Sequence, residues 1–385
     1  MNVRLRLILL TFMLPLLHGC GGGGSSVAPT PAPPPAPTPA PAPALVPADT
    51  SYKNFKSVGL TPQTLPAGRA GVGSVRAYGD FSRSGRLDLF TATLTYWPPT
   101  TPAAATPSVF EFWRKQANGS FVKDAQMLVS SNGCIHPRKA IVADFNGDGR
   151  PDIFVACHGF DAPPFPGERN KIILSQANGT YVTQDASSDI GFFHSASAAD
   201  LNGDGKIDVV VTNNFDPSSA FALINQGAGT FQREALARLP SSIGGKPYFS
   251  VELVDINEDG KVDLILGGHE WDGAATVAFL NPGSSDFTSA TPITLPAVSN
   301  EGVVLDFAVT GTGSTRTLWL LRTSGGDGTF YQSRTIQKVL WPSLTSTIAL
   351  RERPAQWFQW ILPTTVNGQS VIAPEDASVN VAIPQ

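Results

Sequence analysis

The chain has 385 residues, with 27 basic and 31 acidic side chains and a formal net charge of −4. It has no cluster of basic residues interleaved with aromatic ones, which argues against nucleic acid as a partner. A charged fraction of only 15%, together with 37 glycines and 33 prolines, is typical of a turn-rich extracytoplasmic β protein.

Residues 1–19 are predicted to be a secretory signal peptide. Arg4 and Arg6 supply its positive charge, and the apolar run over residues 7–17 is too short to span a bilayer. The four residues that end at Cys20 resemble the cleavage box of bacterial lipoproteins, which implies that Cys20 is lipidated. The resemblance, with Gly at position 21, implies an outer-membrane lipoprotein on the periplasmic or surface face, attached to the membrane only through its lipid. The alternative is an ordinary signal peptide followed by an incidental cysteine.

Residues 20–49 are predicted to form a tether, and residues 50–385 to form the folded domain. After Cys20 the tether has a run of glycines and then a stretch rich in proline and alanine. Such a stretch favours the extended polyproline II conformation, at roughly 3 Å per residue. The sequence therefore predicts a lipid-anchored domain that is held away from the membrane.

Three acidic segments of the form Asp-x-Asn-x-Asp-Gly-x-x-Asp recur along the domain. They begin at Asp144, Asp200 and Asp255, so the intervals are 56 residues (200−144) and 55 residues (255−200). Short apolar runs precede and follow each segment, which indicates a strand, a loop and a second strand. A repeat of this length indicates a stacked or closed repeat architecture.

These acidic loops are predicted to bind Ca²⁺, because oxygen ligands at alternate positions of a tight loop suit this ion. The expected ligands are four side chains and one backbone carbonyl per loop, the carbonyl being that of the basic residue: Asp144, Asn146, Asp148, Arg150, Asp152; Asp200, Asn202, Asp204, Lys206, Asp208; Asp255, Asn257, Asp259, Lys261, Asp263. An EF-hand is excluded, because its twelfth position requires Glu and these loops have Val155, Val211 and Leu266 there. Plain solvated turns are the alternative, since Asp, Asn and Gly also favour turns.

Two weaker copies extend the series. Asp80 and Asp88 enclose a loop that has serines in place of the middle Asn and Asp, and a weak Ca²⁺ site and a plain turn both remain open for it. Residues 306–312 have lost the charge that Ca²⁺ requires, and we expect a loop with a structural role only.

A second motif, a Gly turn followed by an aromatic residue, recurs out of phase with the acidic loops. It occurs at residues 118–121, 178–181, 228–231 and 327–330, and in a looser form at 282–287. Asn-Gly and Asp-Gly turns between apolar runs are strong hairpin signals. One hairpin closed by an acidic loop and one closed by this turn make four strands per repeat, which is the content of a β-propeller blade.

The acidic loops resemble FG-GAP (VCBS-type) repeats, the Ca²⁺-binding blades of integrin-α-like propellers. The resemblance implies an all-β fold, a β-propeller of four-stranded blades with Ca²⁺ as its cofactor. At roughly 55 residues per blade the domain fits six blades, with seven as the alternative. Members of this family serve adhesion, carbohydrate binding, assembly and in some cases catalysis, so the resemblance is weak on function.

Cys134 and Cys157 flank the hairpin that carries the first full acidic loop, and both are expected at its opposite end. In an oxidising compartment a disulfide between them is the default. A metal site built from these cysteines with His136 and His158 is the alternative.

Four histidines recur at the expected ends of strands. His136 and His194 lie just before inner strands, whereas His158 and His269 lie six residues after the last Asp of their loops. We expect one rim of the propeller, opposite the acidic loops, to bind a ligand. Its predicted residues are His136, Arg138, His158, His194, Asn214, His269, Glu270 and Trp271. Transition-metal binding and acid–base chemistry are further possibilities, and for each histidine alone an ordinary loop residue is the alternative.

These features predict an envelope-tethered, Ca²⁺-binding propeller that recognises a protein or glycan through its rim. An enzyme is the less favoured hypothesis: a polysaccharide lyase or hydrolase would use the rim histidines with Arg138 or Glu270. Paired carboxylates are sparse there, the chain has no nucleophile elbow or phosphate loop, and no catalytic residue is predicted. A purely structural envelope protein is the third hypothesis.

Overall fold

The structure is a computed structural model, and it describes residues 75–92, 94, 101–130, 133–214, 219–234, 238–353, 358–374 and 381–385. The predicted signal peptide, Cys20 and the tether lie outside the described residues. In the part of the chain that is described, no helix has the length and apolar character needed to cross a membrane.

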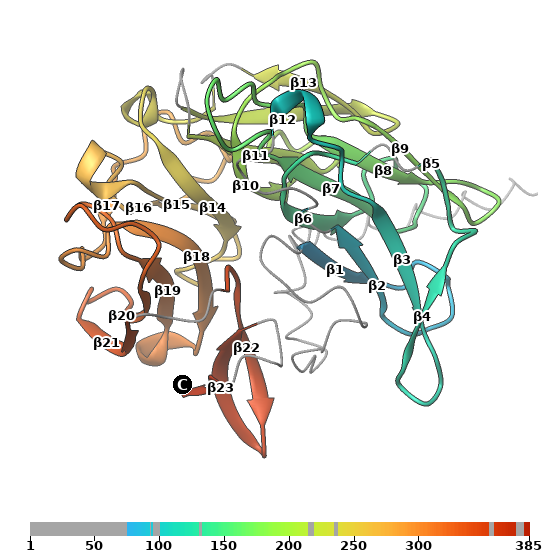
Figure 1. Cartoon of the computed structure of the whole chain (residues 1–385). Helices are drawn as coiled ribbons and strands as arrows, with labels where there is room; N and C mark the ends of the chain where they lie inside the picture. The colour runs from blue at the N-terminus through green and yellow to red at the C-terminus, as the bar shows by residue number, and fades with distance from the viewer. Residues whose placement is uncertain are drawn as a thin grey trace, which may run out of the picture. The chain divides into compact units, whose positions relative to one another are not determined.

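The described residues form six antiparallel sheets that follow one another along the chain (Figure 1). The first sheet has β1 (Val75–Gly79), β2 (Asp88–Ala92), β3 (Phe110–Lys115) and β4 (Phe121–Asp124). The second has β6 (Pro137–Ala143), β7 (Asp152–Cys157), β8 (Lys171–Ser175) and β9 (Tyr181–Asp185), with β5 (Leu128–Ser130) added parallel to β9. The third has β10 (Phe193–Ala199), β11 (Asp208–Asn213), β12 (Ser219–Gly227) and β13 (Thr230–Glu234).

The remaining three sheets repeat this order. The fourth has β14 (Tyr248–Val254), β15 (Asp263–Gly268), β16 (Val277–Phe279) and β17 (Ile293–Thr294). The fifth has β18 (Val303–Thr310), β19 (Thr317–Thr323), β20 (Arg334–Leu340) and β21 (Ser346–Glu352). The sixth has β22 (Ile361–Val366), β23 (Gln369–Pro374) and β24 (Ile383–Pro384). Short 3-10 helices lie between strands, at η2 (Pro102–Ala104), η3 (Ser241–Ile243), η4 (Glu270–Asp272) and η5 (Gly313–Thr315).

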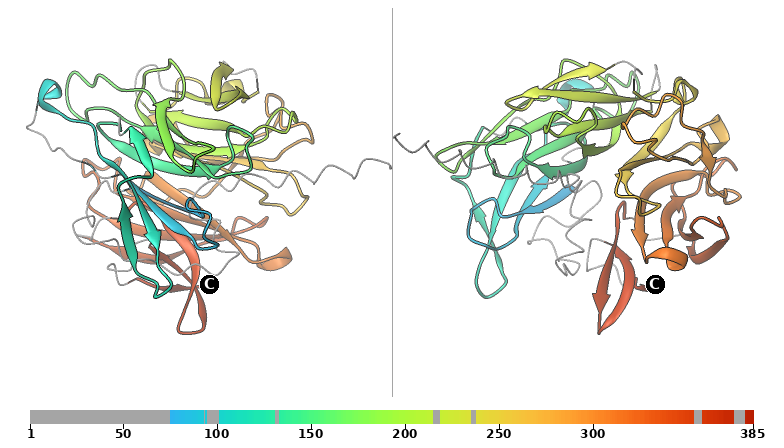
Figure 2. Two further views of the ribbon diagram at one scale, coloured as in Figure 1. Left: turned by 90° about the vertical axis from the view of Figure 1, so that its right-hand side faces the viewer. Right: turned by 180° about the vertical axis from the view of Figure 1, so that it is seen from behind.

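The sheets are the blades of a six-bladed propeller, seen from further sides in Figure 2. Each blade packs its first strand against the first strand of the next blade, from β1 through β6, β10, β14 and β18 to β22. The last blade meets the first, because Trp360 and Leu362 pack against Tyr78 and Leu89. The expected six blades of four strands are therefore confirmed, with three strands described in the sixth.

The packing of the blades explains the continuous apolar run in a second strand such as β11. In β11 the side chains of Val209 and Val211 pack toward the second blade, whereas Val210 packs toward the fourth. Successive side chains of a strand point to opposite faces of the sheet, and both faces of a blade are covered by its neighbours. All three valines are fully buried.

Two expectations about the fifth blade were wrong in position. Residues 306–310 lie within β18, and the loop that corresponds to the acidic loops begins at Gly311, which is 56 residues after Asp255 (311−255). Asp306 is buried, and its Oδ2 accepts a hydrogen bond of 2.8 Å from the Ile361 backbone N–H of the sixth blade. Residues 327–330 connect the second and third strands of their blade, whereas the matching turns at 118–121 and 178–181 connect the third and fourth. This shift places Phe330 at the end of the blade opposite the acidic loop.

Candidate functional site

The first aspartate of each acidic loop organises the loop backbone. In the second blade, Asp144 Oδ1 accepts the N–H of Gly147 at 2.7 Å, and its Oδ2 accepts the N–H of Gly149 at 2.7 Å. Asp200 and Asp255 make the equivalent pair of bonds in the next two blades. Each carboxylate therefore holds one turn of backbone around itself, which fixes the positions of the other oxygen side chains.

The sixth loop position requires glycine for a conformational reason. Gly149 has φ +77° and Gly205 has φ +83°, in the left-handed region that glycine adopts without strain. The fourth position is also left-handed, yet in the fourth blade it holds Glu258 at φ +63°. The Glu258 carboxylate accepts the N–H of Gly313 at 2.6 Å, so this residue links its loop to the next blade.

The last aspartate of each motif is completely buried and has a structural role that the sequence did not reveal. Asp208 Oδ2 accepts the N–H of Leu201 at 2.9 Å, and Oδ1 accepts the N–H of Asn225 at 2.8 Å. The carboxylate thus fastens the loop to the third strand of its own blade. Asp88, Asp152 and Asp263 make the same two kinds of bond. The first blade keeps this arrangement although its loop lacks the middle acids.

The remaining loop oxygens fit a hard cation. Asp204 pairs with Lys206 at 2.5 Å, and this hydrogen bond lowers the pKa of Asp204, so its carboxylate is ionised. The pKa of Asp208 is raised to about 6, chiefly by burial and also by the charges of Asp204 and Asp200. Several carboxylates that repel one another around one small loop form a donor set that Ca²⁺ would stabilise. The loop at Asp80 offers hydroxyls instead, so its donor set is weaker.

The opposite end of the blades carries the four histidines, and the structure brings them together. In blade two the hairpin pairs Pro137 with Cys157 at one end and Ala143 with Asp152 at the other. His136 and His158 adjoin the first pair, and the acidic loop adjoins the second. Seven strand residues separate the two ends by about 20 Å.

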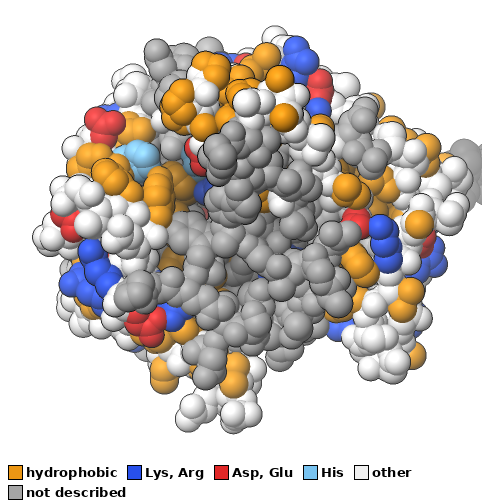
Figure 3. All heavy atoms as spheres, viewed as in Figure 1, with side chains coloured by type: hydrophobic (Ala, Val, Ile, Leu, Met, Phe, Trp, Pro, Cys, Tyr) orange, Lys and Arg blue, Asp and Glu red, His pale blue; other side chains and the backbone are white. Residues whose placement is uncertain are grey.

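The rings form a continuous row across neighbouring blades, which we call the aromatic row: His136, His158, His194, Phe249, His269, Trp271 and Phe330. Its closest centroid separations are 3.9 Å for His194 and Phe249 and 4.2 Å for His158 and His194. Figure 3 shows one face of the molecule, where exposed histidine atoms, in pale blue, lie among hydrophobic side chains. The row begins in the second blade and ends in the fifth.

A bulge near the start of the inner strands aims one side chain of each blade at this row. The pairing of β6, β10 and β14 with their second strands shifts at Arg138, His194 and Phe249 respectively. Each of these residues lies six positions before the first Asp of its acidic loop. A bulge redirects a side chain in this way. The sequence analysis placed His194 just before an inner strand. This position was wrong, because His194 belongs to β10 itself. Phe249, which the sequence analysis missed, occupies the equivalent position in the next blade.

The histidines of the row are neutral. Burial lowers the pKa of His136 and His158 well below the usual value, and the charge of Arg138 lowers both further. Burial does the same for His194, and it lowers the pKa of His269 to about 4. Neutral imidazoles can accept hydrogen bonds or bind metal ions at physiological pH.

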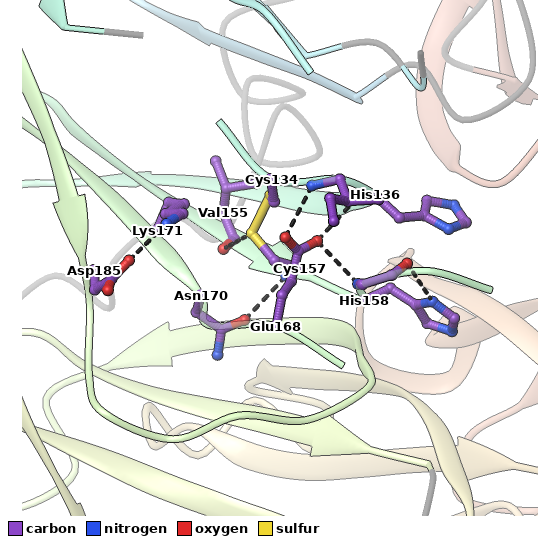
Figure 4. The surroundings of a disulfide bond; sticks show 11 residues. Cys134, His136, Val155, Cys157, His158, Glu168, Asn170, Lys171 and Asp185 are labelled. Atoms are coloured by element: carbon purple, nitrogen blue, oxygen red, sulfur yellow. Dashed lines mark hydrogen bonds and ion pairs between the residues drawn. A yellow bond between two sulfur atoms is a disulfide. The ribbon is translucent and has the colours of Figure 1, made fainter. Parts of the chain in front are cut away.

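Blade two has a rigid frame behind its two histidines (Figure 4). Cys134 and Cys157 form a disulfide, as expected, with 5.9 Å between their Cα atoms. The cysteines are therefore not available as thiolates, and the alternative metal site that included them is wrong. The Glu168 carboxylate accepts the backbone N–H groups of His136 at 3.0 Å and Gly159 at 2.9 Å. Glu168 lies in the long loop after His158 and was not among the predicted site residues.

Three other predicted rim residues have different surroundings. Glu270 is engaged by Arg322 at 3.0 Å and by the hydroxyl of Thr276 at 2.5 Å. Asn214 lies beside the row, where its backbone N–H donates to the Phe192 carbonyl at 3.3 Å. Trp271 is stacked on His269 with 4.5 Å between centroids and is 41% exposed.

The comparisons with known proteins agree with this geometry. Three overlapping segments, residues 80–155, 144–211 and 200–266, match the family described as FG-GAP-like repeat. The chain is an FG-GAP-repeat β-propeller. A stretch of 97 residues is 37% identical to integrin alpha-PS5 of Drosophila melanogaster, and it makes up 23% of this chain and 10% of that protein. The matched part therefore spans only a tenth of the integrin. The FG-GAP propeller fold itself supports a role in binding or recognition.

The solved structures that superpose on this chain do so at low sequence identity and low TM-score. An exotype rhamnogalacturonan lyase, YesX, superposes with a TM-score of 0.37 and 13% identity, over 82% of this chain and 58% of that one. An exo-β-1,3-galactanase from Phanerochaete chrysosporium superposes with a TM-score of 0.38 and 8% identity, over 76% and 70% of the two chains. Similarities at this level carry no argument about activity.

The FG-GAP propeller also has a buried polar cluster where its inner strands converge. Lys139 of β6 pairs with Glu252 of β14 at 2.7 Å, and both side chains are almost fully buried. Ser197 of β10 donates to Glu252 at 3.3 Å, so three blades share the cluster. No sequence pattern indicated this pair, because its members lie 113 residues apart.

Proposed function

We propose that this FG-GAP propeller is a Ca²⁺-binding recognition protein, tethered to the cell envelope through lipidated Cys20, that binds a protein or glycan through its histidine rim. The observation that carries the proposal is the aromatic row. Its rings come from four successive blades and meet at the end of the strands opposite the acidic loops. Side chains from several rigid elements that converge on one region are typical of ligand sites.

The exposed end of the row provides a contact surface for a macromolecule. Trp271 is 41% exposed, Phe330 is 46% exposed and Tyr331 is 44% exposed, and the rings of the first two lie 5.4 Å apart. Large aromatic side chains exposed side by side mark interaction surfaces, and they are enriched in the centres of interfaces. Glycines 302, 325 and 326 pack against the Trp271 ring, which holds it in place.

Ca²⁺ would act at the other end of the blades. The side chains of Asp144, Asn146 and Asp148 and the carbonyl of Arg150 would hold the ion in blade two, with Asp152 beside them, and the same positions would serve in blades three and four. The bound ion would neutralise the clustered carboxylates and rigidify the loops. The proposed role of Ca²⁺ is therefore structural.

The structure gives the enzyme hypothesis less support. Glu270, one of the two residues that a lyase or hydrolase was expected to use, is held by Arg322 and Thr276. A two-acid glycosidase mechanism requires a pair of available carboxylates, and Glu270 already has these two partners. A recognition role uses the same surface without needing such a pair.

The test is binding of the full-length protein to glycan arrays and to envelope extracts, with Trp271→Ala, Phe330→Ala and a His136/His194 double variant. The aromatic variants should lose at least about tenfold in affinity, since aromatic anchors commonly contribute more than 1 kcal/mol to an interface. Asp204→Ala is the control, because its loop lies about 20 Å from the rim, and it should bind as wild type. A partner that binds all rim variants with wild-type affinity would contradict the proposal and leave a structural role as the better explanation.

A further inference from the structure

Three side chains at the blade-two end of the aromatic row form a cluster with the chemistry of a metal site. One ring nitrogen of His136, one of His158 and a carboxylate oxygen of Asp161 lie within 4.8 Å of one another. The His158 Nε2 and Asp161 Oδ1 atoms are 4.0 Å apart. Ligands around a tetrahedral ion at about 2.0–2.2 Å stand about 3.3–3.6 Å from each other. A contraction of about 1 Å would bring the three atoms to these distances. The exposed Asp161 side chain can move toward the histidines, and small rotations of the two imidazoles would close the distance between their nitrogens.

The two histidines are held in place by their backbone. Each follows closely on a cysteine of the Cys134–Cys157 disulfide, and the His158 N–H donates to the His136 carbonyl at 2.9 Å. The Glu168 carboxylate bridges the backbone N–H of His136 to that of Gly159, on the far side of His158. In Figure 4 both imidazoles point to the same side, away from the disulfide. A disulfide and a half-buried carboxylate therefore hold the backbone that carries the two potential ligands, as a preorganised site requires.

The tautomer of His158 also suits a metal ligand. Its Nδ1 lies 3.4 Å from the Gly159 carbonyl, and this contact places the proton on Nδ1. The lone pair is then on Nε2, the nitrogen that faces Asp161. A hydrogen bond from the second ring nitrogen to a backbone carbonyl is the usual partner of a metal-bound histidine.

We propose that His136, His158 and Asp161 bind a divalent transition-metal ion, with Zn²⁺ as the first candidate. Two imidazoles with one carboxylate match the preferences of Zn²⁺, whereas Ca²⁺ takes oxygen ligands and is expected only at the acidic loops. Three protein ligands leave a coordination position for water or for a donor group of a bound molecule. The proposal does not depend on the macromolecular partner, because the ion can be measured without one.

The guanidinium of Arg138 lies next to His136 and affects how a metal ion could bind there. Its Nη1 donates a hydrogen bond to His136 Nε2 at 3.2 Å, so the guanidinium occupies the lone pair of this nitrogen and must move aside before a metal ion can bind there. A bound cation would repel this group. Removal of the charge by Arg138→Gln should therefore leave Zn²⁺ affinity unchanged or increase it. An anion held by the guanidinium would show the opposite response, so this variant separates the two kinds of ligand.

The experiment uses the full-length protein without a polyhistidine tag, freed of transition metals and kept in Ca²⁺ to saturate the acidic loops. Equilibrium dialysis with Zn²⁺, followed by elemental analysis, gives the stoichiometry, and Co²⁺ in place of Zn²⁺ gives a visible spectrum that reports nitrogen ligation. Wild type should bind one Zn²⁺ per chain. His158→Ala and Asp161→Asn should each weaken binding by at least about tenfold. His269→Gln is the matched control, since its imidazole lies outside the cluster, and it should bind as wild type.

Asp161→Asn changes an exposed side chain, so it tests the site even where a histidine variant fails to fold. Wild-type Zn²⁺ affinity in Asp161→Asn and His158→Ala, no bound Zn²⁺ in the wild-type protein, or lost binding in Arg138→Gln would each overturn the proposal. Loss of Zn²⁺ in the two ligand variants with retained glycan or protein binding would support the metal site and separate it from the recognition role.

Discussion

The two kinds of aspartate in one acidic loop should respond differently to Ca²⁺, and the third blade offers the test. Asp208 is fully buried and accepts two backbone N–H groups, from Leu201 and Asn225. Asp204 lies near the surface of the loop, where it pairs with Lys206. We expect Asp208→Ala to destabilise the protein with and without Ca²⁺, and Asp204→Ala to do so only when Ca²⁺ is present.

The magnitude follows from the hydrogen bonds. Asp208→Ala leaves two buried N–H groups without an acceptor, and each costs about 1–3 kcal/mol. The buried carboxylate is itself destabilised, since burial raises the pKa of Asp208 to about 6, and its removal recovers part of that cost. We therefore expect a loss of about 2–3 kcal/mol in excess EDTA, in the lower half of the summed range. Asp204→Ala under the same conditions should stay within about 0.5 kcal/mol of wild type, as surface substitutions usually do.

Urea unfolding at pH 8, where the Asp208 carboxylate is ionised in the folded protein, measures both quantities. Each variant is compared with wild type in saturating Ca²⁺ and in excess EDTA. Wild type itself should be more stable in Ca²⁺, because an ion that binds only the folded loop shifts the equilibrium toward it. An Asp208→Ala protein as stable as wild type in EDTA would refute the structural role of the buried carboxylate. Equal effects of Asp204→Ala in both conditions would refute its role as a Ca²⁺ ligand.

Three further predictions concern the disulfide, the rim and the anchor. Replacement of Cys134 and Cys157 by serine should cost about 3 kcal/mol in urea unfolding, the value that loop-closure entropy gives for cysteines 23 residues apart; a change below about 1 kcal/mol would contradict it. The pKa of His269, about 4 when folded, lies below its unfolded value near 6.5, so the unfolded chain binds the extra proton between these pH values. The free energy of unfolding should therefore fall as pH is lowered through this window. His269→Gln should reduce the slope of this free energy against pH by up to about 1.4 kcal/mol per pH unit. An unchanged slope would show that His269 does not titrate this way. Mass spectrometry of the mature protein should find lipid on Cys20 and no free thiol, whereas an unmodified Cys20 would remove the proposed anchor.

The sequence predicted the blades well where local chemistry determines them. Each full acidic loop has its first Asp, its left-handed glycine and its last Asp at fixed offsets, and the flanking apolar runs continue directly into paired strands. In the fifth blade these residues are missing, and the position of the loop was then misjudged by five residues (311−306). The pattern alone could not distinguish a strand residue such as Asp306 from the start of a loop.

The candidate site was predictable only in part, because most of its contacts join distant segments. The strand-end positions of the four histidines follow from the repeat, and their convergence follows from the fold. Phe249, Glu168 and the Lys139–Glu252 pair were missed, since each acts through a partner on another strand or another blade. The offset of six residues before the first Asp, shared by Arg138, His194 and Phe249, was present in the sequence and could have identified the bulged positions.

The residues at the loop end repeat from blade to blade, whereas the residues at the rim differ. This difference indicates at which end of the blades we expect ligand specificity. At the loop end, Asp88, Asp152, Asp208 and Asp263 make the same pair of hydrogen bonds in four blades, including the first blade, whose loop lacks the middle acids. A feature that four blades share without change cannot distinguish one ligand from another. At the rim, equivalent bulged positions hold Arg138, His194 and Phe249, and only blade two adds a disulfide and Glu168. Chemistry that changes from blade to blade on a constant frame can fit one particular ligand. The rim is therefore where substitutions should alter recognition, and the acidic loops are where they should alter stability.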